Sequence, residues 1–170
     1  MSKRITILVG TMTGTAEIVA EDVRDSLKAL GWDVELVMMD DLDGQVFERE
    51  GYFLVCSSTY GQGDVPDNAM KLYDDLGRSR PDLSGKRYGV IALGDSAYVE
   101  TFTNGGLRFD RILSELGAAR VGAVCQHDAS SDEVPEEKGV AWAREWVKLL
   151  DSGARAADDR SDRPANPEVR

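Results

Sequence analysis

Three threonines at alternate positions stand near the start of the chain, just before a predicted helix. Thr11, Thr13 and Thr15 follow a short apolar run and flank Gly14. The N–H groups and positive dipole at a helix start attract anions, and hydroxyls can add hydrogen bonds to a phosphate. No lysine follows Gly14 and no Gly-x-Gly-x-x-Gly sequence is present, so the loop is neither a P-loop nor a dinucleotide fingerprint. The pattern indicates either a phosphate site made of neutral donors or an ordinary helix start capped by Thr13 or Thr15.

Two later loops each place a tyrosine after a predicted strand. Tyr60 precedes the Gly-x-Gly sequence of residues 61–63, whose glycines would let backbone approach a ligand closely. Tyr98 lies in the loop after the next strand. The two rings could enclose one planar ring system, since aromatic stacking contributes about 0.5–1.5 kcal/mol per pair beyond area burial. Alternatively, Tyr60 is a surface residue and the glycines only make turns. We expect Phe102 to pack inward and anchor the third loop.

The composition argues against several other kinds of site. Lysine and arginine number 20 against 31 aspartates and glutamates, and this net charge of -11 excludes a basic nucleic-acid-binding surface. Cys56 and Cys125 form no Cys-x-x-Cys pair, and the single His127 gives zinc too few ligands, so we expect two buried, reduced thiols. No apolar run approaches the roughly 20 residues that cross a bilayer. The run Ile5–Val9 is too short for a signal peptide, which predicts a cytoplasmic protein without membrane contact.

Predicted strands and helices alternate along the chain. Helical spacing puts Val19, Val23, Leu27 and Leu30 on one face of a helix that ends at Gly31. Such alternation predicts a parallel α/β sheet with helices on both faces, in which a ligand lies beyond the carboxyl ends of the strands. The expected strands are Ile5–Val9, Val34–Met38, Tyr52–Cys56, Tyr88–Leu93 and Val121–Cys125, and the expected helices are Ala16–Leu30, Asn68–Leu76, one through Phe109–Leu116 and one beginning near Pro135.

The last part of the chain lacks this pattern. Residues 152–170 contain Pro164, Pro167 and many charged side chains, but almost no large apolar residue. Such a segment cannot bury enough apolar surface to offset the entropy of ordering it. We therefore predict one folded domain over residues 1–151 and a disordered tail over residues 152–170.

Taken together, the three loops resemble those of the flavodoxin family. Residues 11–17 are similar to the phosphate loop of flavodoxins and of the FMN-binding domains of diflavin reductases. Residues 58–64 and 93–98 resemble the second and third flavin loops. The resemblance covers about residues 4–150, extends to MioC-like flavodoxins, and is of the short-chain type because no insertion interrupts the fifth expected strand. It implies a flavodoxin-like, doubly wound, five-stranded parallel α/β sheet in the order 2-1-3-4-5.

The resemblance also implies FMN as the cofactor and names its contacts. The first loop would hold the phosphate, Tyr60 and Tyr98 would flank the isoalloxazine, and Asp128 would reach toward the flavin. Backbone of the second and third loops would meet the edge of the ring system. The cofactor-binding residues expected in this way are Thr11, Met12, Thr13, Gly14, Thr15, Ala16, Ser58, Thr59, Tyr60, Gly61, Leu93, Gly94, Asp95, Tyr98, Phe102 and Asp128.

The resemblance implies an electron carrier without catalytic residues. A flavodoxin reductase would supply electrons and an acceptor protein would take them, each docking on a monomer through an acidic rim that we define as Asp64, Asp67, Asp74, Asp75 and Glu100. Because one fold hosts many functions, an FMN-dependent NAD(P)H quinone or nitro reductase is the alternative. A third possibility is an accessory module that uses FMN structurally.

Overall fold

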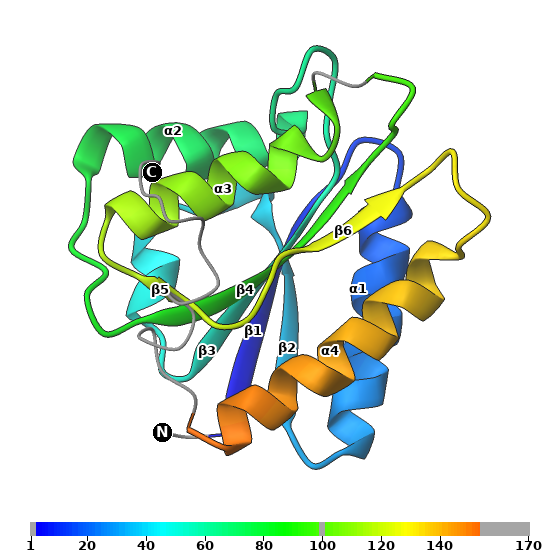
Figure 1. Ribbon diagram of the computed structural model, residues 1–170. Coiled ribbons are helices and arrows are strands. Elements are labelled where there is room, and N and C mark those ends of the chain that lie inside the picture. Colours follow the sequence, from blue (N-terminus) through cyan, green and yellow to red (C-terminus); the bar gives the residue numbers. More distant parts are fainter. Residues whose placement is uncertain (1–2, 99–100, 154–170) are drawn as a thin grey trace, which may run out of the picture.

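Strands and helices alternate to form one open sheet covered on both faces (Figure 1). The computed structural model describes residues 3–98 and 101–153. The strands are β1 (Arg4–Gly10), β2 (Asp33–Met38), β3 (Tyr52–Ser57), β4 (Arg87–Gly94), β5 (Ala119–Arg120) and β6 (Cys125–Asp128). The helices are α1 (Thr15–Ala29), α2 (Met70–Ser79), α3 (Asn104–Glu115) and α4 (Pro135–Asp151), with 3₁₀ turns at Met39–Asp41, Gly44–Glu48 and Asp67–Ala69.

All strand pairs in the sheet are parallel, in the order β2-β1-β3-β4-β5, and β6 also pairs with β4. This confirms the expected order. The strand order reverses between β1 and β3, where connections leave toward opposite faces, and a cleft forms beyond the strand ends at such a point. The loops after β1, β3 and β4 all end at this edge.

Each face of the sheet has its own hydrophobic core. Helices α1 and α4 cover one face and α2 and α3 cover the other (Figure 1). The central strand β3 is buried throughout, as a strand covered on both faces must be. This packing fixes the positions of the strand ends from which the three loops leave.

Helix α1 shows how its sequence sets its bounds. Val19, Val23 and Leu27 are fully buried, as their spacing predicts. Leu30, expected on the same face, is instead 49% exposed because the helix ends at Ala29 and Leu30 is its cap. The chain then turns through Gly31 at φ +96°, a left-handed conformation that glycine adopts without steric cost.

The fifth strand position differs from the prediction. The expected strand Val121–Cys125 is wrong, since only Cys125 of that run is in a strand and the edge consists of two pieces, β5 and β6. Between them, four residues, 121–124, oppose two residues of β4, 89–90. Helix α4 packs against this part of the sheet, where a Cβ on Gly89 would stand 2.6 Å from the indole nitrogen of Trp146. The indole of Trp142 donates to the carbonyl of Ala123 at 3.1 Å, within the bulged segment.

Cys56 and Cys125 are both buried and unpaired, as expected. Burial raises the pKa of the Cys56 thiol well above its usual range and that of Cys125 to about 11, so both stay protonated at neutral pH.

Among the described residues, no helix is both long and apolar enough to cross a membrane, and no group of side chains is arranged to hold a metal ion. The predicted tail from residue 154 onward lies outside the described residues.

Candidate cofactor-binding site

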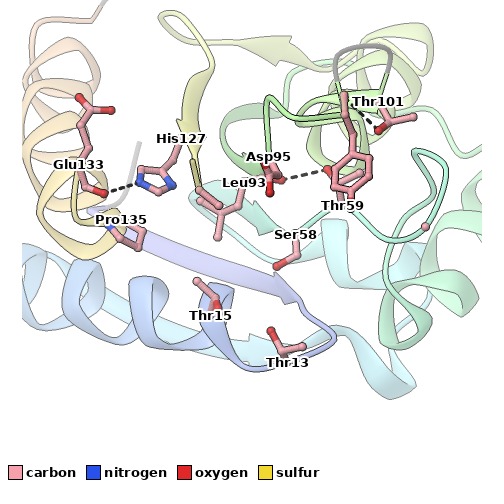
Figure 2. Close-up of a pocket in the computed structure, with 14 residues that line it drawn as sticks. Thr13, Thr15, Ser58, Thr59, Leu93, Asp95, Thr101, His127, Glu133 and Pro135 are labelled. Carbon is pink, nitrogen blue, oxygen red and sulfur yellow. Dashed lines mark hydrogen bonds between the residues drawn. The ribbon is translucent and has the colours of Figure 1, made fainter. Parts of the chain in front are cut away.

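A cavity of about 680 Å³ lies at the carboxyl ends of the strands (Figure 2). This volume is within the range typical of small-molecule and cofactor sites. The described residues that line it are Thr13, Thr15, Ser58, Thr59, Gly61, Leu93, Gly94, Asp95, Tyr98, Thr101, His127, Ala129, Glu133 and Pro135. The fold therefore brings parts of all three predicted loops to one cavity, together with the loop between β6 and α4.

The first loop leaves the start of α1 open. The N-cap is Gly14, at φ +100°, and no side chain caps the helix, so the alternative in which Thr13 or Thr15 caps it is wrong. The hydroxyl of Thr11 instead accepts a hydrogen bond from the Gly14 N–H at 2.9 Å, within the loop itself. Thr13 and Thr15 face the cavity. The result is an uncapped, positively polarised helix start with two hydroxyls beside it, which suits an anion.

The second loop is a tight turn with its ends paired. The backbone of Tyr60 exchanges hydrogen bonds of 2.8 Å with Asp64, and the turn passes through Gly61 at φ +55° and Gly63 at φ +97°. The side-chain amide of Asn104 in α3 donates to the Gly63 carbonyl at 2.7 Å. A Cβ on Gly63 would stand 2.9 Å from that amide nitrogen, so this position has room only for glycine.

Thr59 joins the second loop to the third. Its hydroxyl donates to the Leu93 carbonyl at 3.0 Å and accepts from the Gly105 N–H, at the start of α3, at 2.9 Å. Gly105 in turn lies against the Ser58 backbone so closely that a Cβ would collide with the Ser58 carbonyl. One hydroxyl thus fixes two loops and a helix relative to one another.

Both predicted ring-stacking residues are exposed, but only one of them lines the cavity. Tyr98 is 67% exposed and lines the cavity, whereas Tyr60 is 45% exposed and lies outside the lining, although its neighbour Gly61 is part of it. A flat ligand that stacks on such a ring removes apolar surface from water, which favours binding. Phe102 is half-buried and does not line the cavity.

Asp128 holds two loops together. One of its carboxylate oxygens accepts from the N–H of Ser96 at 2.9 Å and from the N–H and hydroxyl of Ser130 at 2.9 and 2.7 Å. These hydrogen bonds hold the pKa of Asp128 well below its usual range. The side chain does not line the cavity. A direct contact with the flavin stays a prediction, while the hydrogen bonds give this residue a role in shaping the site.

Five residues that line the cavity were not predicted from the sequence: Thr101, His127, Ala129, Glu133 and Pro135. Four of them follow Cys125, where the expected fifth strand stopped. The register of β6, with His127 opposite Leu93 and Asp128 opposite Gly94, carries that strand to the edge of the cavity. A sequence-based prediction that placed β6 correctly would have identified these four residues. Of the predicted residues, Thr11, Met12, Gly14, Ala16, Tyr60, Phe102 and Asp128 do not line the cavity.

Comparison with known proteins assigns the family. The family model described as flavodoxin matches residues 7–142. Flavodoxin YqcA of Escherichia coli strain K12 is 41% identical over 146 residues, which cover 86% of this chain and 97% of the relative. The sulfite reductase [NADPH] flavoprotein alpha-component of Bacillus subtilis strain 168 is 35% identical over 166 residues, 97% of this chain but 26% of that protein.

Solved structures agree with the sequence comparisons. A cysteine-to-alanine mutant of flavodoxin from Pseudomonas aeruginosa is 35% identical, and the match covers 87% of this chain and 99% of that one with a TM-score of 0.76. The likeness therefore extends over most of the chain. The chain belongs to the flavodoxin family, whose members are electron-transfer proteins with FMN as their cofactor.

Proposed function

We propose that this flavodoxin binds FMN in the cavity at the strand ends and carries electrons between a reductase and an acceptor protein. The observation that supports this most directly is the combination of one uncapped helix start with an exposed tyrosine in a single cavity. The helix start suits one monophosphate, and the tyrosine suits a flat ring system near the surface.

The residues of the cavity fit FMN. The phosphate would be held by the hydroxyls of Thr13 and Thr15 and by the first N–H groups of α1. The hydrogen bond between the Gly14 N–H and the Thr11 hydroxyl would keep the loop in shape. Backbone of Gly61 and of Gly94 would meet the flavin edge, since both lie in the cavity wall without a side chain between backbone and ligand. FMN supplies one- and two-electron chemistry, and the protein supplies binding, orientation and electrostatics.

The exposure of the site favours a carrier over a reductase of small molecules. Tyr98 is 67% exposed, so a ring system lying against it would be covered on one side by the protein and remain near the surface. Electron transfer needs only that a partner protein can approach the exposed flavin. Hydride transfer needs a second pocket in which the nicotinamide stacks on the flavin. NAD(P)H oxidation by the purified protein would support the reductase alternative.

One residue of the predicted acidic rim contacts the first loop. The backbone N–H of Asp67 contacts the sulfur of Met12 in the first loop at 3.2 Å, and the Asp67 carboxylate is exposed. Asp64 lies 3.6 Å from Arg108, which offsets some of its charge. Asp75 accepts from the Gly44 N–H at 2.8 Å and faces a 3₁₀ turn, while Glu100 lies outside the described residues. We therefore expect Asp67 to contribute more than Asp64 or Asp75 to the docking of a basic partner.

Two measurements on the purified protein test the proposal. The chromophore is released and identified by mass spectrometry, and FMN is expected, because the cavity offers one anion site; mainly FAD would contradict it. The holoprotein is then mixed with NADPH, with and without a flavodoxin reductase. Bleaching of the flavin only when the reductase is present supports a carrier, and bleaching without it supports the enzyme. Bound FMN that no reductase reduces would indicate a structural cofactor.

A variant tests the position of the phosphate. Thr13→Ala removes one hydroxyl donor to a charged group, which costs about 1.5–3 kcal/mol, or roughly 10- to 150-fold in FMN affinity. Thr101→Ala, a change at the opposite side of the cavity, should leave the affinity within about threefold. Fluorescence titration of the apoprotein measures both. Equal affinities for the two variants would place the phosphate elsewhere.

A further inference from the structure

A side chain from a distant part of the sequence contacts the first loop where it leaves β1. Asn68 lies in the 3₁₀ turn Asp67–Ala69, just before α2, and is half-buried. Its side-chain oxygen accepts a hydrogen bond from the Thr11 N–H at 2.8 Å, and its side-chain nitrogen donates to the Val9 carbonyl at 3.2 Å. Because an N–H must meet the oxygen and a carbonyl must meet the nitrogen, these two partners fix the orientation of the amide.

The amide occupies a position in the sheet that β2 leaves open. On one side of β1, pairing with β3 continues to Gly10, which lies opposite Ser57. On the other side β2 ends at Met38, opposite Val9. The amide bonds the carbonyl before Gly10 and the N–H after it, as a residue of a neighbouring parallel strand would. Asn68 therefore continues the pairing of β1 by one residue beyond the end of β2.

The turn that carries this amide is itself fixed in place. A Cβ on Gly10 would stand 3.2 Å from the Cβ of Ala69, so the turn packs directly on the end of β1. The N–H of Asp67 contacts the sulfur of Met12 at 3.2 Å. The amide nitrogen also donates to the Asp40 carboxylate, in the 3₁₀ turn after β2, at 3.2 Å. Two consecutive residues of the turn thus contact two consecutive residues of the first loop.

Thr11 connects this contact to the start of α1. Its hydroxyl accepts from the N–H of Gly14 at 2.9 Å, and Gly14 is the N-cap of the helix. Thr11 does not line the cavity, whereas Thr13 and Thr15, on either side of Gly14, do. The amide of Asn68 holds the backbone of Thr11, and the hydroxyl of Thr11 holds Gly14. In this way Asn68 sets the position of the helix start without reaching the cavity.

A second asparagine holds the second loop in a similar way. The side-chain amide of Asn104 donates to the Gly63 carbonyl at 2.7 Å, and the same turn carries Gly61 to the cavity wall. One asparagine therefore supports the loop expected to meet the phosphate, and the other supports a loop expected to meet the ring system. This pair allows the two parts of the site to be disturbed separately.

We propose that Asn68 is a positioning residue of the cofactor site, which holds the first loop in its phosphate-binding shape before the cofactor binds. This inference rests on the proposed FMN site. A loop that is already ordered loses less conformational entropy on binding, and only a ligand that carries the phosphate gains from this. Asn68 therefore contributes to the preference for FMN over riboflavin, which lacks the phosphate.

Two matched variants test the preference. Asn68→Ala and Asn104→Ala each remove one side-chain amide without a change of charge, and the apoproteins are titrated by fluorescence with FMN and with riboflavin. In Asn68→Ala we expect the affinity for FMN to fall roughly tenfold and that for riboflavin to stay within about twofold. In Asn104→Ala both affinities should fall by the same factor, so the ratio between them stays that of the wild type.

Phosphorus NMR of the holoproteins reports on the phosphate directly. The resonance of bound FMN depends on the groups that surround the phosphate. It should move in Asn68→Ala, where the start of α1 has lost its support, and stay in place in Asn104→Ala. A general loss of stability would not single out this resonance, so the measurement distinguishes a positioning role from a merely structural one.

Hydrogen exchange tests the inference on the wild-type protein. In the apoprotein, the N–H groups of Thr11 and Gly14 should already exchange more slowly than those of an unstructured chain, because each has its acceptor within the protein. If both exchange as in an unstructured chain until FMN is added, the phosphate orders the loop and Asn68 does not. This measurement decides the question even if Asn68→Ala does not fold.

The outcomes separate this inference from the proposed function. Equal losses of FMN and riboflavin affinity in Asn68→Ala, or an unmoved phosphorus resonance, would overturn the role of Asn68 and leave the FMN site intact. Failure of FMN to bind the wild-type apoprotein would contradict the proposed site itself.

Discussion

The hydroxyl of Thr59 offers a sharp test of how the site is held together. Thr59→Val keeps the β-branched shape of the side chain and removes only the hydroxyl. That group donates to the Leu93 carbonyl at 3.0 Å and accepts from the Gly105 N–H at 2.9 Å. The substitution therefore disconnects the second loop from the third loop and from the start of α3 while leaving the apolar packing in place.

The size of the effect follows from these two hydrogen bonds. Each contributes about 0.5–1.5 kcal/mol, and the Gly105 N–H and Leu93 carbonyl are left without that partner in a partly buried position. We expect the free energy of unfolding to fall by about 2 kcal/mol. For a chain of this size, 1 kcal/mol shifts the melting temperature by about 2–4 °C, so the midpoint should fall by about 4–8 °C. FMN affinity should fall as well, because two walls of the cavity lose their connection.

The assay is urea unfolding of the apoproteins, with fluorescence titration for FMN affinity. The control is Thr101→Val, which removes a hydroxyl from the same cavity whose hydrogen bond, to the Tyr98 carbonyl, is exposed and 3.3 Å long. That variant should lose about 0.5 kcal/mol or less. If the two variants unfold within about 0.5 kcal/mol of each other, the Thr59 hydroxyl does not connect the loops in the way argued.

Three further predictions concern pH, packing and salt. Folding lowers the pKa of the Asp128 carboxyl, so its contribution to stability is complete above the ordinary aspartate pKa of about 3.9 and is lost as the pH falls below it. The urea midpoints of the wild type and of Asp128→Asn should therefore differ at pH 7 and converge toward pH 3. A difference that stays constant with pH would contradict this. Gly77→Ala, in α2 with its nearest neighbour 4.0 Å away, should stabilise the protein by up to about 1 kcal/mol, whereas Gly139→Ala, in α4 with Val19 at 2.8 Å from the new Cβ, should destabilise it despite the same gain in helix propensity; thermal melts that shift in the same direction would refute the packing argument. Reduction of the bound flavin by a reductase should slow several-fold between ~0.02 and ~0.5 M salt if the acidic rim guides docking, and a salt-independent rate would exclude it.

The sequence by itself determined the order of the elements and the three loops. Continuous apolar runs such as Tyr52–Cys56 specify buried parallel strands, because both faces of such a strand meet helices. Once β1, β3 and β4 are recognised, parallel pairing brings their carboxyl ends to one edge. The threonines of the first loop, Gly61 and Gly94 each lie at the end of a strand or a few residues after it. Their place at the cavity follows from the position of those strands.

Tertiary packing alone decided what happens at the fifth strand position. Nothing in the local pattern of residues 119–128 indicates that the indoles of Trp142 and Trp146, well beyond it in the chain, pack where a straight edge strand would run. The bulge lies beside these indoles, and the register of β6 beyond it brings His127 to the cavity.

Side chains that could serve either a loop or a ligand were also assigned only by the tertiary structure. The hydroxyl of Thr11 and the carboxylate of Asp128 have the chemistry of ligand-binding groups, yet both form hydrogen bonds within and between loops. The sequence specifies which groups can accept or donate hydrogen bonds. Their partners depend on distances between loops, which only the packing of the helices on the sheet determines.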